Sequence, residues 1–247
     1  MKWINTPLAK TIRNMSSSDI VVVDTETTGL NVEVCELLQI AITDGSGSEL
    51  FSSYIKPTAL VWPSAFKVNG ITRDMVKNAP KISKVRKEIQ AIFDNAKVIV
   101  GYNINFDINF LEAAGLIVPP LKFDVMTEFA SYRSKKHGTP YRRCRLSECA
   151  EYFGHSFTPH NADADVSVTA DCFNDMISDP IFYKSKRKAK KDGDITGKEP
   201  AKKVKLTVQK KTPSKWRAVV IGLILLMFTT YYVNNKPNDP NNNTDDS

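Results

Sequence analysis

The sequence predicts an α/β fold: a mixed five-stranded sheet flanked by helices. Two observations predict it. Apolar runs of strand length recur between residues 21 and 125, and from residue 64 onward they alternate with stretches whose apolar residues recur every three or four positions. The first three strands follow one another without an intervening helix. A hairpin first, and then strands alternating with helices, indicates a sheet of mixed direction.

The strands are expected in the following order. Val21–Val23 are contiguous and β-branched, which favours a strand buried on both faces. Glu36–Thr43 and Glu49–Ile55 are separated by Asp44-Gly45-Ser46-Gly47, whose residue types are typical of a β-hairpin turn. Ala96–Tyr102 reads as another buried strand, and Leu121–Val125 predicts a short fifth one.

The helices are expected between and after these strands. Ser64–Asn95 is helical in pieces and is interrupted by Pro80. The next helix carries Phe106 and Phe110, both expected in the core, and ends near Gly115. Three further helices are predicted at Val125–Tyr132, Arg145–Phe153 and Ala162–Ile177.

Composition indicates one main folded domain. The chain has 247 residues with a hydrophobic share of 42%, enough for one sizeable core. The net charge of +7 is unevenly distributed. Residues 184–217 carry an excess of eleven positive charges, whereas residues 1–183 hold nineteen basic and twenty-one acidic side chains.

The four cysteines show no CxxC spacing, which argues against a zinc site or a disulfide scaffold and favours a reducing compartment. The N-terminus lacks the apolar run of a cleaved signal peptide.

The first predicted strand delivers two carboxylates. Asp24 and Glu26 follow the valine run, and residues two apart in a strand point to the same side. Two close like charges at the end of a buried strand require protons or cations, and carboxylate oxygens suit Mg²⁺ or Mn²⁺. The alternative is a strand end whose two acids only face solvent.

Two distant segments repeat this theme of an acid beside a buried element. Asp107 lies just past the strand that ends near Tyr102, within GYNINFD. His160 and Asp165 lie in HNADAD, at the entry to the last predicted helix.

These motifs resemble those of the DEDDh 3′-to-5′ exonucleases of the RNase H-like superfamily, which include the proofreading subunit of bacterial DNA polymerase. The shared order is DxE after a first strand, an Asn-containing turn with FD, and H-x4-D before a final helix. The resemblance covers about Asp19 to Met176. It implies that Asp24, Glu26, Asp107 and Asp165 bind metal and that His160 is the general base.

The resemblance also implies hydrolysis of single-stranded 3′ ends to nucleoside monophosphates with two Mg²⁺ or Mn²⁺ ions, with DNA favoured over RNA as substrate. Phosphodiester cleavage places extra negative charge on the phosphate and on the entering and leaving oxygens, which two cations held by four carboxylates stabilise. An imidazole, whose ordinary pKa is about 6.5, can take a proton from the attacking water near neutral pH.

Substrate contacts are also carried over from the resemblance. Leu30 and Phe66 correspond to apolar residues that pack against the terminal bases, and Thr27 lies where the 3′ end is held. Asn103, in the Asn-containing turn, is assigned to substrate binding with them.

The chain departs from the family pattern at three positions near these motifs. Tyr102 and Asn69 stand where many relatives have histidine, and Gln39 occupies a position that is often acidic. None is a metal ligand, so the departures concern substrate contacts. Asp163 is expected to be a helix-start acid rather than a fifth ligand.

Two other functional classes fit these residues less well. A haloacid dehalogenase-like phosphatase requires DxD after its first strand, and Glu26 stands in the third position here. A non-catalytic adaptor that binds nucleic-acid ends remains as an alternative, against which the intact carboxylates and His160 argue.

The C-terminal region predicts a membrane anchor. Residues 218–233 carry no charge and have aromatic residues at both ends, as in an interfacial belt. Sixteen helical residues rise about 24 Å, and Trp216 and Arg217 extend this toward a hydrocarbon core of about 30 Å. The basic N-terminal flank then orients the nuclease domain to the cytosol as a single-pass tail anchor. The alternatives are a helix docked on the nuclease domain and a soluble exonuclease whose last helix binds a protein partner.

The expected organisation therefore has five parts. They are an N-terminal extension (1–18), an exonuclease domain (19–178), a basic and disordered linker (179–215), a transmembrane helix (216–233) and a polar tail (234–247).

Overall fold

The computed structural model of this chain describes residues 6–183. The chain separates into two units, residues 1–189 and 190–247, and all described residues lie in the first. The described elements are, in order, α1 (Thr6–Arg13), the 3₁₀ helix η1 (Ser17–Asp19), β1 (Ile20–Thr27), β2 (Leu37–Asp44), β3 (Glu49–Tyr54), α2 (Pro63–Asn69), α3 (Arg73–Val76), α4 (Ile82–Asn95), β4 (Val98–Gly101), α5 (Asn105–Ala113), β5 (Leu121–Asp124), α6 (Val125–His137), α7 (Leu146–Phe153), α8 (Ala162–Ser178) and α9 (Pro180–Tyr183).

The sheet has five strands in the order β3-β2-β1-β4-β5. The pairs β1–β2 and β2–β3 are antiparallel, whereas β1–β4 and β4–β5 are parallel. The predicted mixed sheet is therefore confirmed. Gly101 ends β4 beside β1, where a Cβ atom would lie 2.9 Å from the carbonyl oxygen of Val23. Only glycine allows the two strands to approach this closely at that level.

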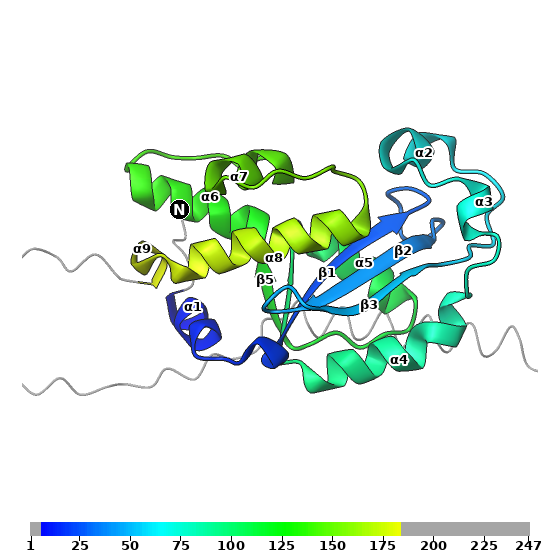
Figure 1. The fold of residues 1–247 in the computed structure, drawn as a ribbon, viewed down its shortest axis with the longest axis horizontal. Coiled ribbons are helices and arrows are strands. Elements are labelled where there is room, and N and C mark those ends of the chain that lie inside the picture. Colours follow the sequence, from blue (N-terminus) through cyan, green and yellow to red (C-terminus); the bar gives the residue numbers. More distant parts are fainter. Residues whose placement is uncertain (1–5, 184–247) are drawn as a thin grey trace, which may run out of the picture. The chain divides into compact units, whose positions relative to one another are not determined.

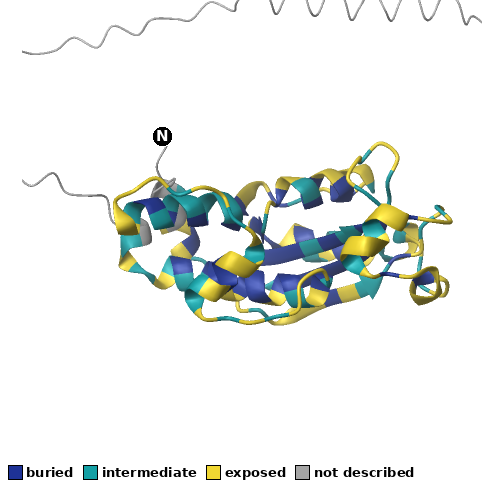
Figure 2. Ribbon diagram, turned by 90° about the horizontal axis from the view of Figure 1, so that it is seen from above, coloured by how far each residue is buried: buried dark blue, intermediate teal, exposed yellow. Residues whose placement is uncertain are grey.

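Helices cover both faces of the sheet (Figure 1). Val22 of β1 belongs to a core shared with α6, α7 and α8, and its neighbours Val21 and Val23 belong to a second core shared with α4 and α5. This alternation follows from the two-residue period of a strand. Figure 2 shows the buried residues gathered along the strands and the inward faces of the helices.

Most predicted elements form, with shifted ends. The β2–β3 hairpin turns through Gly47, whose φ is 87°. The helix α6 continues to His137, five residues past its predicted end at Tyr132, because Gly138 takes the left-handed C-cap conformation and three basic side chains occupy the last turn. Residues of the N-terminal extension form α1, which was not predicted and buries Ile12 in the core shared with α8.

Among residues 6–183, no helix is long and apolar enough to cross a membrane. The predicted transmembrane segment, 216–233, lies outside the described residues.

Candidate active site

The C-terminal half of β1 carries two candidate carboxylates on one face. Asp24 and Glu26 alternate with Thr25 and Thr27, so they lie on the same side of the sheet as Val22, toward α8. In the register with β2, Asp24 pairs with Ala41 and Glu26 pairs with Gln39. The strand is irregular between Glu26 and Thr27, at the point where the chain leaves the sheet.

The helix α5 brings Asp107 to β1. Its side chain is 3% exposed, and its Oδ1 accepts hydrogen bonds from the backbone N–H of Thr25 at 2.9 Å and from the Thr25 hydroxyl at 2.7 Å. The threonine between the two strand acids therefore holds the third acid in place. This role of Thr25 was not predicted.

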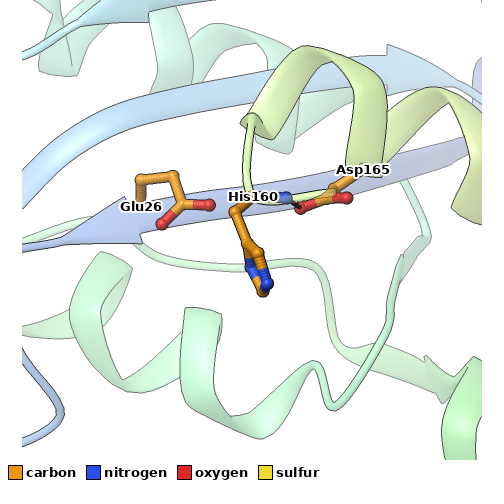
Figure 3. A group of neighbouring side chains, drawn as sticks. All are labelled: Glu26, His160 and Asp165. Carbon is orange, nitrogen blue, oxygen red and sulfur yellow. Dashed lines mark hydrogen bonds between the residues drawn. The ribbon is translucent and has the colours of Figure 1, made fainter. Parts of the chain in front are cut away.

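The N-terminal turn of α8 supplies Asp165, and His160 lies in the loop just before that helix (Figure 3). The backbone N–H of His160 donates to Asp165 Oδ2 at 3.0 Å, and Asn161 caps the helix by accepting from the N–H groups of Asp163 and Ala164. His160 has a φ of 69° and an exposed side chain. One ligand atom from each of Glu26, His160 and Asp165 lies within 4.8 Å of the others.

The electrostatics of the site disfavour four ionised acids without a counter-charge. Burial, together with the nearby charges of Asp107, Asp165 and Glu26, raises the pKa of Asp24 well above its ordinary value. Burial raises the pKa of Glu26 to about 7 against a hydrogen bond from Asn69, and it raises that of Asp107 to about 7 against the bonds from Thr25. Burial also raises the pKa of Asp165.

These residues fit a divalent cation. Asp165 Oδ1 is buried and has no hydrogen-bond partner, although a carboxylate oxygen in the interior normally has one. Hard oxygen donors from several carboxylates are what Mg²⁺ and Mn²⁺ prefer, and a cation offsets both the burial of these charges and the repulsion between them.

A second set of hydrogen bonds fixes the start of α8 on the sheet. Gln39 is 2% exposed, and its Nε2 donates to Asp163 Oδ2 at 3.0 Å, while the N–H of Ala162 donates to its Oε1 at 3.4 Å. Ser52 Oγ of β3 donates to the other oxygen of Asp163. Asp163 lies in the first turn of α8, as expected, and it also ties that turn to β2 and β3. The sequence signal for this link is Gln39 itself, a polar residue within the buried run LLQIAI.

The predicted substrate residues differ in exposure and in their contacts. Leu30 is 86% exposed and Phe66 is 47% exposed, as side chains that contact bases would be. Phe66 lines a surface groove of about 530 Å³, whereas Leu30 does not. Thr27 is buried and its hydroxyl donates to the carbonyl of Gly29 at 2.6 Å. Asn103 has a φ of 62°, and its N–H donates to Asp124 Oδ1 at 3.1 Å.

Two departures from the family pattern also find partners. Asn69 hydrogen-bonds to Glu26 and donates from Nδ2 to the carbonyl of Thr27 at 3.3 Å. It therefore contacts the end of β1 directly. The hydroxyl of Tyr102 donates to the carbonyl of Cys144 at 2.7 Å and so points toward the segment between α6 and α7.

Comparison with known proteins identifies the family. The family model described as Exonuclease matches residues 21–173, which is more than half of the chain and a range that contains all five candidate catalytic residues. The chain belongs to this exonuclease family. Membership assigns it 3′-to-5′ exonuclease activity, as the resemblance implied.

The relatives of this exonuclease include subunits of DNA polymerase III and larger proteins. DNA polymerase III subunit epsilon of Treponema pallidum is 33% identical over 161 residues, which cover 63% of this chain and 74% of that protein. The 3′-5′ exonuclease DinG of Bacillus subtilis is 30% identical over 172 residues, or 66% of this chain, but the match spans only 18% of that protein.

A solved structure supports the fold. The crystal structure of E. coli Exonuclease I in complex with a dA16 oligonucleotide matches with a TM-score of 0.56 at 19% identity, over 66% of this chain and 42% of that chain. At this identity the likeness concerns the fold alone.

Proposed function

We propose that this exonuclease hydrolyses single-stranded 3′ ends with two Mg²⁺ or Mn²⁺ ions, held by Asp24, Glu26, Asp107 and Asp165, and with His160 as general base. One observation carries the proposal. Acids from β1, α5 and α8 share one buried centre in which Glu26, Asp107 and Asp165 each raise the cost of ionising Asp24, and His160 lies at its exposed edge. Such perturbed groups in proximity are typical of catalytic sites.

The residues divide the work as follows. When bound, the two cations stabilise the charge that develops on the phosphate and on the entering and leaving oxygens. An imidazole nitrogen of His160 takes a proton from the water whose oxygen forms the new bond to phosphorus. The bond between phosphorus and the 3′ oxygen of the preceding nucleotide breaks, and that oxygen takes a proton from solvent. The products are a nucleoside 5′-monophosphate and a new 3′ hydroxyl.

The remaining residues orient the strand end. Leu30 and Phe66 offer exposed apolar surface to the terminal bases, Thr27 follows Glu26 at the end of β1, and Asn103 lies between β4 and α5. Apolar and aromatic contacts of this kind accept any base, which suits an enzyme that shortens strands of any sequence.

A nuclease assay tests this function. With Mg²⁺, the wild-type chain should shorten a 5′-labelled single-stranded oligonucleotide and release mononucleotides, and EDTA should stop the reaction. Asp24→Ala should abolish it, whereas Glu88→Ala, which removes an exposed acid of α4, should not. A wild-type chain that binds strand ends without shortening them would support the adaptor alternative instead.

The proposed preference is for DNA. The similar proteins include DNA polymerase III subunit epsilon, and Exonuclease I has been solved with a DNA oligonucleotide. The test compares rates on DNA and RNA strands of the same sequence. Faster hydrolysis of RNA would reverse the assignment, because the 2′ hydroxyl is the group that distinguishes the two.

We further propose that residues 216–233 anchor the enzyme to a membrane, with the nuclease domain on the cytosolic side. The uncharged run, its aromatic ends and the basic segment before it support this. After alkaline carbonate extraction of membranes from cells that make the full chain, the protein should stay in the pellet. Release into the supernatant would favour a soluble exonuclease whose last segment binds a protein partner.

A further inference from the structure

The end of α6 and the segment that joins it to α7 are strongly basic. From Arg133 to Arg145 the sequence holds six Lys or Arg residues and no acid. Arg142, Arg143 and Arg145 are exposed, and among residues 6–183 none of the three forms an ion pair. These three side chains are called the arginine segment below.

The fold holds the backbone between Arg133 and Arg145 in place. At its start, the guanidinium of Arg133 stacks between the rings of Tyr141 and Tyr152, 4.1 and 4.3 Å from their centroids. The N–H of Tyr141 donates to Ser134 Oγ at 2.8 Å. At its end, the hydroxyl of Tyr102 donates to the carbonyl of Cys144 at 2.7 Å. The arginines therefore extend from an anchored segment.

The hydrogen bond between Tyr102 and Cys144 also places the arginine segment beside the active site. The parallel strands β1 and β4 pair Val22 with Val100, and Gly101 lies against the carbonyl of Val23. Tyr102 therefore follows β4 at the end of the sheet where Asp24 follows Val23 in β1. Cys144, which lies between Arg143 and Arg145, is hydrogen-bonded to Tyr102. The segment also joins α6 and α7, which share a core with α8 on the face of the sheet that carries Asp24 and Glu26 (Figure 1).

Stability of the fold does not explain these charges. Arg145 directly precedes the first turn of α7, where the helix dipole disfavours a cation. Its backbone N–H donates to Glu148 at 3.3 Å, a bond that any residue could make. Three exposed cations without ion pairs beside a site of four carboxylates fit a polyanion that has to approach that site.

We propose that Arg142, Arg143 and Arg145 bind phosphates of the nucleic-acid strand upstream of the terminal nucleotide. This inference rests on the proposed function, because it assigns the part of the substrate that lies beyond the catalytic centre. Guanidinium groups bind phosphate through paired N–H donors, and such contacts position a strand without reading its sequence. The arginine segment sets affinity for long strands, and the carboxylates and His160 perform the chemistry.

The experiment compares a long substrate with a minimal one, using the full chain with Mg²⁺. The long substrate is a single-stranded oligonucleotide, and the minimal one is the p-nitrophenyl ester of thymidine 5′-monophosphate, which has one phosphate and no upstream strand. The variants are R142A/R143A/R145A, the charge-retaining R142K/R143K/R145K, and the control K84A/R86A/K87A. The control removes three exposed cations from α4, which covers the opposite face of the sheet.

The alanine variant should raise KM for the oligonucleotide about tenfold at low salt and leave kcat/KM for the ester unchanged. For this variant, the slope of log affinity against log salt concentration should be less steep by about 2, because three contacts to single-stranded phosphate contribute about 0.7 each. The lysine variant should keep most of the affinity, and the control should match wild type.

The other possible results overturn either the role of the arginine segment or the proposed function. An alanine variant that matches wild type on the oligonucleotide, or that loses activity equally on both substrates, overturns the role of the arginine segment. An equal loss in the α4 control also overturns it, since the effect is then one of net charge. A wild-type chain that is inactive on both substrates refutes the proposed function itself.

Discussion

His160 and Asn103 share an unusual backbone conformation. Within residues 6–183 they are the two non-glycine residues with positive φ, and they lie just before the helices that carry Asp107 and Asp165. This conformation costs on the order of 1 kcal/mol for a residue with a Cβ atom, so it persists where the surrounding structure requires it. At His160 it turns the backbone N–H toward Asp165 and leaves the imidazole exposed at the edge of the site.

Removing this imidazole should separate catalysis from metal binding. In His160→Ala the backbone bond to Asp165 is retained, and turnover near neutral pH should fall by about 10² to 10⁴ because no other group takes the proton. Calorimetric titration with Mn²⁺ should show little change in affinity. His155→Ala, which removes an imidazole paired with Asp175 instead, is the control. An unchanged rate in His160→Ala would remove His160 from the role of general base.

The amide of Gln39 and the carboxylate of Asp163 form a hydrogen-bonded pair whose two groups can be exchanged by substitution. Gln39→Glu sets a carboxylate against that of Asp163 and should displace the start of α8, with a loss of about tenfold in kcat and weaker Mn²⁺ binding. Adding Asp163→Asn restores one donor and one acceptor in reversed order and should recover most of both. If the double variant is as impaired as Gln39→Glu alone, the pair does not position the site.

At the scale of the element, the start of α8 holds three residues with separate roles. Asn161 caps the helix, Asp163 binds the sheet, and Asp165 enters the site, all within five residues. The geometry of Asp165 therefore depends on a well-formed helix start.

A cap substitution measures that dependence. Asn161→Ala should cost about 1 kcal/mol of stability, or about 3 °C in Tm, because two N–H groups lose their acceptor. Mn²⁺ affinity should fall with it. Asn161→Ser, which keeps a capping oxygen, should stay near wild type in thermal unfolding and in metal titration. A loss of stability without any change in metal affinity would separate the cap from the site.

At the scale of the whole molecule, the converging acids make stability depend on pH and on metal. The folded-state pKa values of Glu26 and Asp107 are raised to about 7, above those of the unfolded chain. Between about pH 4 and pH 7 the folded protein therefore binds more protons than the unfolded one. The free energy of unfolding of the metal-free protein falls as pH rises through this window.

Thermal unfolding from pH 5 to pH 8 checks this. Tm of the metal-free protein should fall as pH rises, and Mg²⁺ or Mn²⁺ should restore it most strongly at pH 8. Asp24→Asn should raise Tm of the metal-free protein at pH 8 and abolish the gain from metal. The matched control is Glu128→Gln, since burial and Asp124 also raise the pKa of Glu128 to about 7. It should raise Tm with and without metal, and equal metal responses in both variants would contradict the assignment of Asp24.

The sequence by itself determined the strand and helix periods, the mixed sheet and the residue types of the candidate site. These features are local: a valine run, a two-residue spacing of acids or a glycine turn acts through its immediate neighbours in the chain. The contacts that arrange the site were decided by the tertiary structure alone. Thr25 meets Asp107 across 82 residues and Gln39 meets Asp163 across 124, and the burial that raises the pKa values exists only once α5 and α8 pack on β1. Such contacts depend on how whole elements pack, and no local pattern in the chain encodes that packing.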